Sequence, residues 1–157
     1  MTQQDASFSD GQEKPLNIAA LEGEGLQVIA ALAQDAVFPI SEMRWLRKSR
    51  QFALLVNRFR WELPQSAAST PERVQSLLAF ENVLSVASQG IDRSDEDVVL
   101  SLLSISYDGN DETGGTLTLV LAGDGAIRLN VEALECRLKD VTKPYKAPSG
   151  SVPSHQD

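Results

Sequence analysis

Apolar and polar residues alternate in several short segments of the chain, and this pattern predicts β-strands. The clearest segment is Thr116–Ala122, where Leu117, Leu119 and Leu121 alternate with β-branched residues. It ends at Gly123-Asp124-Gly125, after which the alternation resumes, as is typical of a tight hairpin. Strands of this kind are predicted at Met43–Arg47, Gln51–Trp61, Arg73–Phe80, Val83–Gln89, Val98–Tyr107, Thr116–Ala122 and Ala126–Asn130.

Apolar residues at helical spacing predict one helix before these strands and one after them. The first runs from about Glu22 to Asp35. The second runs from about Val131 to Val141, because Val131, Leu134, Leu138 and Val141 fall at i, i+3, i+7 and i+10 and so share one face. The sequence therefore predicts a mainly β (α+β) fold, with about seven antiparallel strands in a barrel or strongly bent sheet, an N-terminal helix and a C-terminal capping helix. The alternative is an open sheet with both helices on one face.

Length and composition indicate a single domain. The chain has 157 residues, of which 42% are hydrophobic and 23% charged, so it can bury a continuous core. Residues 1–14 and 143–157 are polar and are predicted to be disordered tails around one globular domain at residues 15–142. Residues 65–71 and 108–115 combine turn-forming residues and are predicted loops.

The cysteine and histidine content leaves few routes to catalysis. Cys136 is the single cysteine, and His155, the single histidine, lies in the predicted C-terminal tail. An internal disulfide, a Cys-His metal site and a histidine-activated nucleophile are therefore not expected. We predict no catalytic, cofactor-binding or metal-binding residues and no enzyme activity. An enzyme that uses clustered carboxylates is the remaining catalytic alternative.

The termini and the net charge limit the location and the partners. The N-terminus has no signal-peptide pattern, and no apolar run is long enough to cross a membrane, so we expect a cytoplasmic protein without a membrane partner. The formal net charge of -8 opposes contact with nucleic acid at long range. A protein of unspecified identity is the expected partner, and the chain is expected to be a monomer or a homodimer.

One stretch of the chain departs from this acidic average. Between Glu42 and Glu62 there is no acidic residue, and four aromatic residues occur there. The basic residues of this possible binding surface are Arg44, Arg47, Lys48, Arg50, Arg58 and Arg60. Cations interleaved with rings are typical of surfaces that bind single-stranded nucleic acid, so RNA or a phosphate head group is an alternative ligand. Strand alternation favours a simpler arrangement, in which Phe59 and Trp61 point to the core and Arg58 and Arg60 to the solvent.

Acidic runs elsewhere in the chain are interpreted as solvated turns. Asp108-Gly109-Asn110-Asp111-Glu112 has alternating oxygen ligands, as in calcium-binding loops. An EF-hand loop that began at Asp108 would need Gly at its sixth position and Glu at its twelfth, where this chain has Thr113 and Leu119. No calcium site is therefore predicted.

Several strings resemble a bacterial, mostly alphaproteobacterial, family that is known as a domain of unknown function. They are Gln34-Asp35-Ala36-Val37, Trp45-Leu46 with Lys48, Phe52-Ala53-Leu54, Asn57-Arg58-Phe59 with Trp61-Glu62, and Gly123-x-Gly125-Ala126-Ile127-Arg128-Leu129. The resemblance covers about residues 15–142 and implies no activity, cofactor or catalytic residue. At the level of fold, seven strands and a closing helix resemble pleckstrin-homology-like domains, and Lys48-Ser49-Arg50-Gln51-Phe52-Ala53-Leu54 is similar to the basic start of their second strand. That likeness implies a fold, not a ligand.

Overall fold

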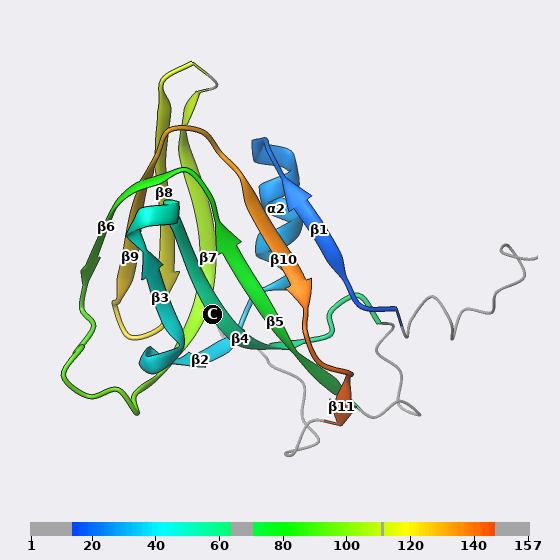
Figure 1. The fold of residues 1–157 in the computed structure, drawn as a ribbon. Coiled ribbons are helices and arrows are strands. Elements are labelled where there is room, and N and C mark those ends of the chain that lie inside the picture. Colours follow the sequence, from blue (N-terminus) through cyan, green and yellow to red (C-terminus); the bar gives the residue numbers. More distant parts are fainter. Residues whose placement is uncertain (1–13, 64–70, 111, 147–157) are drawn as a thin grey trace, which may run out of the picture.

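Antiparallel strands dominate the structure, a computed structural model that describes residues 14–63, 71–110 and 112–146 (Figure 1). In chain order the elements are β1 (Asn17–Ala20), α2 (Gly23–Leu32), β2 (Val37–Pro39), the 3-10 helix η1 (Ile40–Glu42), β3 (Met43–Leu46), the 3-10 helix η2 (Arg47–Ser49), β4 (Gln51–Phe59), β5 (Glu72–Phe80), β6 (Val83–Gln89), β7 (Val99–Asn110), β8 (Gly114–Leu121), β9 (Ala126–Val131), β10 (Cys136–Asp140) and β11 (Tyr145–Lys146). The prediction of a mainly β fold is confirmed.

The strands form one 11-stranded sheet in the order β1-β10-β5-β4-β2-β7-β8-β9-β6, with β3 on β4 and β11 on β5. The terminal strands β1 and β6 do not pair with each other, so the sheet is not closed into a barrel. It nevertheless bends strongly, because apolar side chains from both halves of the strand order, such as Leu54 and Leu119, belong to one core cluster. The expected closed barrel of pleckstrin-homology-like type is therefore wrong for this chain.

The predicted N-terminal helix is present as α2, which ends at Leu32 rather than at Asp35. Leu26 and Ile29 are fully buried and give the helix its apolar face. That face packs against β1, β7 and β10, and it joins the core cluster of the sheet. In Figure 1 the helix lies beside β1 and β10.

All seven predicted strands occur, and the described residues form further strands at β1, β2, β10 and β11. In β8, Leu117, Leu119 and Leu121 are buried, as the alternation predicts. The loop that we expected at residues 108–115 is shorter, because β7 continues to Asn110 and β8 begins at Gly114. The remaining loop prediction, at residues 65–71, lies almost entirely outside the described residues.

The predicted C-terminal helix at Val131–Val141 is wrong, because this segment ends β9 and then forms β10. Cys136, Leu138 and Asp140 are buried while Arg137 and Lys139 are exposed, which is the period of a strand. β10 pairs with β5 on one side and β1 on the other. These contacts, distant in sequence, decide the conformation of a short segment whose apolar spacing fits either element.

The sheet extends beyond the domain boundary that we expected at residue 142. Tyr145 and Lys146 of β11 pair with Arg73 and Glu72 of β5. Of the tails predicted at residues 1–14 and 143–157, residues 1–13 and 147–157 lie outside the described residues.

Candidate functional site

The six predicted basic residues separate into two places. Arg44, Arg47, Lys48 and Arg50 are exposed on β3, η2 and the residue that follows it. The other two, at positions 58 and 60, are buried. The expectation that they point to solvent is wrong, although the burial expected for Phe59 is confirmed. The basic stretch is therefore not one continuous surface.

The register of three strands explains how Arg58 becomes buried. Ser76 on β5 pairs with Val56 of β4 on one side and with Asp140 of β10 on the other. Arg58 lies two residues beyond Val56 and therefore has the same orientation as Phe52, whose side chain belongs to the core. Its side chain consequently extends along the inner face of the sheet toward Ser76 and Asp140.

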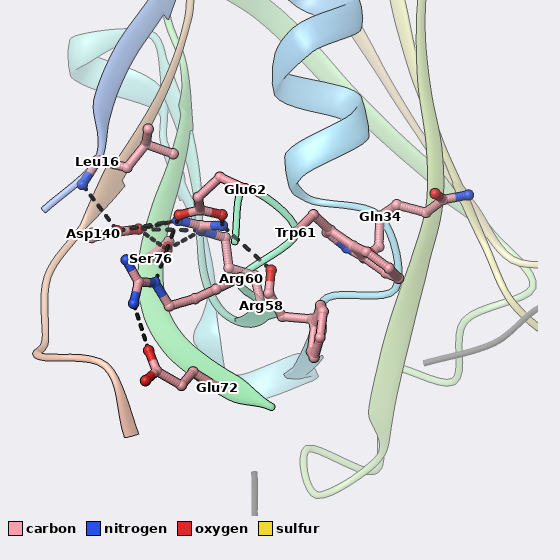
Figure 2. Close-up of polar contacts among 10 residues, drawn as sticks. Leu16, Gln34, Arg58, Arg60, Trp61, Glu62, Glu72, Ser76 and Asp140 are labelled. Atoms are coloured by element: carbon pink, nitrogen blue, oxygen red, sulfur yellow. Dashed lines mark hydrogen bonds and ion pairs between the residues drawn. The ribbon is translucent and has the colours of Figure 1, made fainter. Parts of the chain in front are cut away.

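Arg58 is held by two carboxylates (Figure 2). Its Nη2 donates to Oδ1 of Asp140 at 3.0 Å, and Nη1 and Nη2 donate to the two carboxylate oxygens of Glu62 at 2.8 Å each. The side chains of Arg58 and Asp140 are 0% and 3% exposed, whereas that of Glu62 is 27% exposed. Ser76 Oγ donates to Asp140 Oδ1 at 2.7 Å. A buried arginine thus has its charge balanced at both ends of the guanidinium plane.

The same cluster joins the start and the end of the described chain. The Leu16 backbone N–H donates to Oδ2 of Asp140 at 3.0 Å, and Asp140 itself lies on β10. Arg60 extends the cluster outward by donating to Glu72 Oε1 at 2.5 Å. We call these residues the Arg58 cluster: Arg58, Arg60, Glu62, Glu72, Ser76 and Asp140.

The shifted pKa values of Arg58 and Glu62 favour their charged states. Burial opposes ionisation of both Arg58 and Glu62. For Arg58 the hydrogen bond and the charge of Glu62, together with Asp140, outweigh burial and raise the pKa above the ordinary value of an arginine. For Glu62 the hydrogen bond from Arg58, its own backbone N–H and the nearby positive charges lower the pKa below 4.5. These groups are paired with one another, so the cluster is best understood as an anchor for the fold rather than as acid–base machinery.

The exposed cations lie at the turn between β3 and β4. Arg50 has a left-handed backbone with φ of 54° and forms an exposed ion pair with Glu132 at 3.1 Å. The Arg44 side chain folds back along the chain, and its Nη1 donates to the backbone carbonyls of Met43 on β3 and of Ser41 in η1. Two of the four exposed cations are therefore already engaged with the protein.

A groove of about 580 Å³ lies between β3 and β6. Its apolar lining consists of Ile40, Met43, Trp45, Phe52, Val86 and Ile127, and its polar lining of Ser41, Arg44, Arg47, Ser88, Arg93 and Glu96. Three arginines and one glutamate give this lining a formal charge of +2, in a protein whose net charge is -8. The groove is thus locally positive.

Both strands beside the groove present an edge. In the part of the chain that the structure describes, β3 pairs with β4 alone and β6 pairs with β9 alone. The two edges are held together near one end, where the Val83 N–H donates to the Arg50 carbonyl at 2.9 Å. Figure 1 shows β3 and β6 at the same side of the molecule.

Sequence reasoning missed Asp140 and most of the groove. Asp140 falls within the helix predicted at Val131–Val141. The available signal was the segment Cys-Arg-Leu-Lys-Asp at residues 136–140, in which charged Arg137 and Lys139 alternate with the three residues that the structure buries. For the groove, the available signal was that Val83–Gln89 contains neither a charge nor a proline, which is unusual for an exposed edge strand.

The acidic stretch that begins at Asp108, which the sequence predicts to be a solvated turn, ends β7 and leads into a turn. Oδ1 of Asn110 accepts hydrogen bonds from the backbone N–H groups of Glu112 and Thr113, so this oxygen holds the turn. No group of three His, Cys, Asp or Glu side chains that is suitable for a metal ion occurs in residues 14–63, 71–110 and 112–146. Over the same residues, no helix is long and apolar enough to cross a membrane.

Comparison with known proteins gives a family but no activity. No curated protein and no solved structure matches the chain significantly. The model of a family described as "protein of unknown function (DUF2948)" matches residues 16–155. That range contains every string that led us to expect a family of unknown function. The chain therefore belongs to the DUF2948 family of proteins of unknown function.

Proposed function

We propose that this protein is a non-catalytic binding domain that acts through protein contacts, and that the groove between β3 and β6 is its contact surface. One observation carries the proposal: the groove lies between two strand edges and exposes apolar side chains between them. Met43, Trp45 and Val86 are only partly buried there although they pack on the core. Aromatic, methionine and arginine side chains are the types enriched at protein interfaces, and free strand edges bind extended segments of other chains.

The chemistry of the groove supports a binding role over a catalytic one. Among the described residues that line it, Glu96 is the single carboxylate, and none is a histidine or a cysteine. Acid–base catalysis by paired carboxylates needs two such groups within reach of one substrate. The carboxylates that do come together, Glu62 and Asp140, are paired with Arg58. A cytoplasmic location belongs to the same proposal, in keeping with the free, buried thiol of Cys136.

Site-specific photo-crosslinking tests this function. A photoreactive amino acid at Ser88, which is exposed in the groove, should capture a partner protein in the producing cell. The matched control position is Val120, which is 37% exposed on β8 and does not line the groove. Val86→Asp and Trp45→Ser should each abolish the Ser88 adduct while the variants remain folded. An adduct that survives both substitutions, or that forms equally at Val120, would refute the groove as the contact surface.

A second candidate is a polyanion-binding surface, because Arg44, Arg47, Lys48 and Arg50 remain exposed within seven residues of the chain. The buried Arg58 and Arg60 take no part in it. A 15-nucleotide uridine RNA at low salt is a suitable probe, with the Arg47→Glu, Lys48→Glu and Arg50→Glu triple variant for comparison. No binding at low salt, or binding that the triple variant retains, would exclude this function.

A further inference from the structure

We infer that the groove takes an acidic, extended segment of the partner, which adds as a strand to the free edge of β6. This inference rests on the protein-binding function proposed above and specifies the ligand of that site. It combines three independent features of the groove: the state of its two edges, the charge of its lining and the position of its apolar side chains.

β6 is the edge that is open to a new strand. It is seven residues long and spans roughly 23 Å at about 3.3 Å per residue, long enough for a continuous ladder. Leu84 is 50% exposed, and five of the other six residues are also at least partly exposed. Natural edge strands are normally protected by charges or prolines, and β6 has neither.

β3 is protected where β6 is not. The Arg44 guanidinium donates to the carbonyl of Met43 on β3 and to that of Ser41 just before β3, so these two acceptors are already engaged. β3 also has only four residues. Strand addition is therefore expected along β6, with β3 as the opposite wall of the groove.

The charge of the lining selects the ligand. Arg47 and Arg93 are exposed and approach the groove from opposite sides, since Arg47 follows β3 and Arg93 follows β6. Glu96 is the one carboxylate among the described lining residues. An acidic segment is therefore attracted to this groove although the protein as a whole is negative, and a basic segment is not.

The apolar side chains determine the pattern within the segment. In an added strand, alternate side chains point to the same side. Those that point inward would contact Trp45, Val86 and Ile127, which favours Val or another β-branched residue at alternate positions. Acidic residues at the two ends would lie near Arg47 and Arg93. The ligand class is thus an alternating apolar core flanked by carboxylates.

A defined peptide tests this class with full-length protein. The probe is acetyl-Glu-Glu-Val-Thr-Val-Thr-Val-Glu-Glu-amide carrying a fluorophore, and fluorescence anisotropy gives its Kd. Two control peptides have Lys in place of every Glu, or N-methyl groups on alternate backbone nitrogens. We expect each control to bind at least ~10-fold more weakly than the probe, because one lacks the matching charge and the other cannot complete the ladder.

Protein variants locate the binding. The Arg47→Glu and Arg93→Glu double variant should weaken the probe at least ~10-fold at low salt. Arg128→Glu is the matched control, because Arg128 is exposed on β9 next to the inward-facing Ile127 and does not line the groove. It should change the Kd less than about 2-fold.

Each outcome decides the inference. Equal affinity for the N-methylated peptide overturns strand addition, and equal affinity for the Lys peptide overturns the acidic class. Absence of probe binding also overturns the inference.

A concentration-dependent dimer in sedimentation that Ser88→Arg disrupts would make a second copy of this chain the occupant of the groove instead. If the Ser88 cross-link persists while the probe fails, the binding function stands without this ligand, and if both fail, the proposed function falls as well.

Discussion

Replacing Asp140 with alanine should destabilise the fold far more than a surface charge deletion does. Asp140 is 6% exposed, and its carboxylate accepts from Arg58, from Ser76 Oγ and from the Leu16 backbone N–H. The alanine variant leaves the buried Arg58 with Glu62 as its remaining carboxylate partner, and it removes the acceptor of two other donors. Breaking one partner from a buried ion pair costs about 3–5 kcal/mol.

The remaining Glu62 places the expected loss near the lower limit, at about 3 kcal/mol. This is a large part of the 5–15 kcal/mol typical of a domain. The free energy of unfolding is measured by urea titration, followed by circular dichroism at neutral pH. Glu132→Ala is the control, because the Glu132–Arg50 ion pair is 54% and 55% exposed and should contribute no more than about 1 kcal/mol. A loss for Asp140→Ala within 1 kcal/mol of this control would refute the anchoring role of the Arg58 cluster.

Three further predictions follow from named groups. The pKa of Glu62 is lowered in the fold from 4.5, so its ionised form stabilises the protein above that pH, and the stabilisation is lost as the pH falls. In urea titrations, Glu62→Gln should therefore flatten the decline of the unfolding free energy between about pH 5 and pH 3. Burial raises the pKa of Cys136 to about 12, so iodoacetamide at pH 8 should label the folded protein at least ~100-fold more slowly than the urea-unfolded protein. Gly114 has φ of +75°, and a Cβ there would overlap the Val131 carbonyl. Gly123 has φ of +81° but open space around it, so Gly123→Ala should lower the unfolding free energy by about 1–2 kcal/mol and Gly114→Ala by clearly more. Equal losses would mean that the backbone around Gly114 relaxes.

Local pattern was sufficient for the strands whose alternation is unambiguous, and insufficient where two periods fit. At Leu117, Leu119 and Leu121 the spacing fits a strand alone, and these residues are buried as predicted. At residues 131–141 the apolar residues fit a helix, while Cys136, Leu138 and Asp140 fit a strand only if an aspartate is buried. Pairing with β5 and β1 decides between the two, and that pairing depends on chain segments that are distant in sequence.

The basic stretch was misjudged for a related reason. Alternation correctly separates Arg58 from Phe59, but it does not by itself say which face of β4 is the core. Phe52 and Val56, which share the orientation of Arg58, belong to the core cluster, so the arginine side is the inner one. An arginine tolerates this position because Asp140, 82 residues away in the sequence, reaches it. Residue type alone predicts that arginines are exposed, and it does not reveal that Asp140 pairs with Arg58 in the fold.

The Arg58 cluster and the groove share one strand, and this separates stability from binding. Phe52 near the start of β4 lines the groove, whereas Arg58 near its end belongs to the cluster. Six residues of strand place them about 20 Å apart, beyond the distance at which substitutions usually couple. Asp140→Ala should therefore lower the unfolding free energy while the folded fraction binds the acidic peptide with unchanged Kd. Arg93→Glu should instead weaken binding of the peptide and leave the unfolding free energy unchanged. A parallel loss of both properties in either variant would mean that the groove depends on the cluster, and the two regions would then have to be treated as one site.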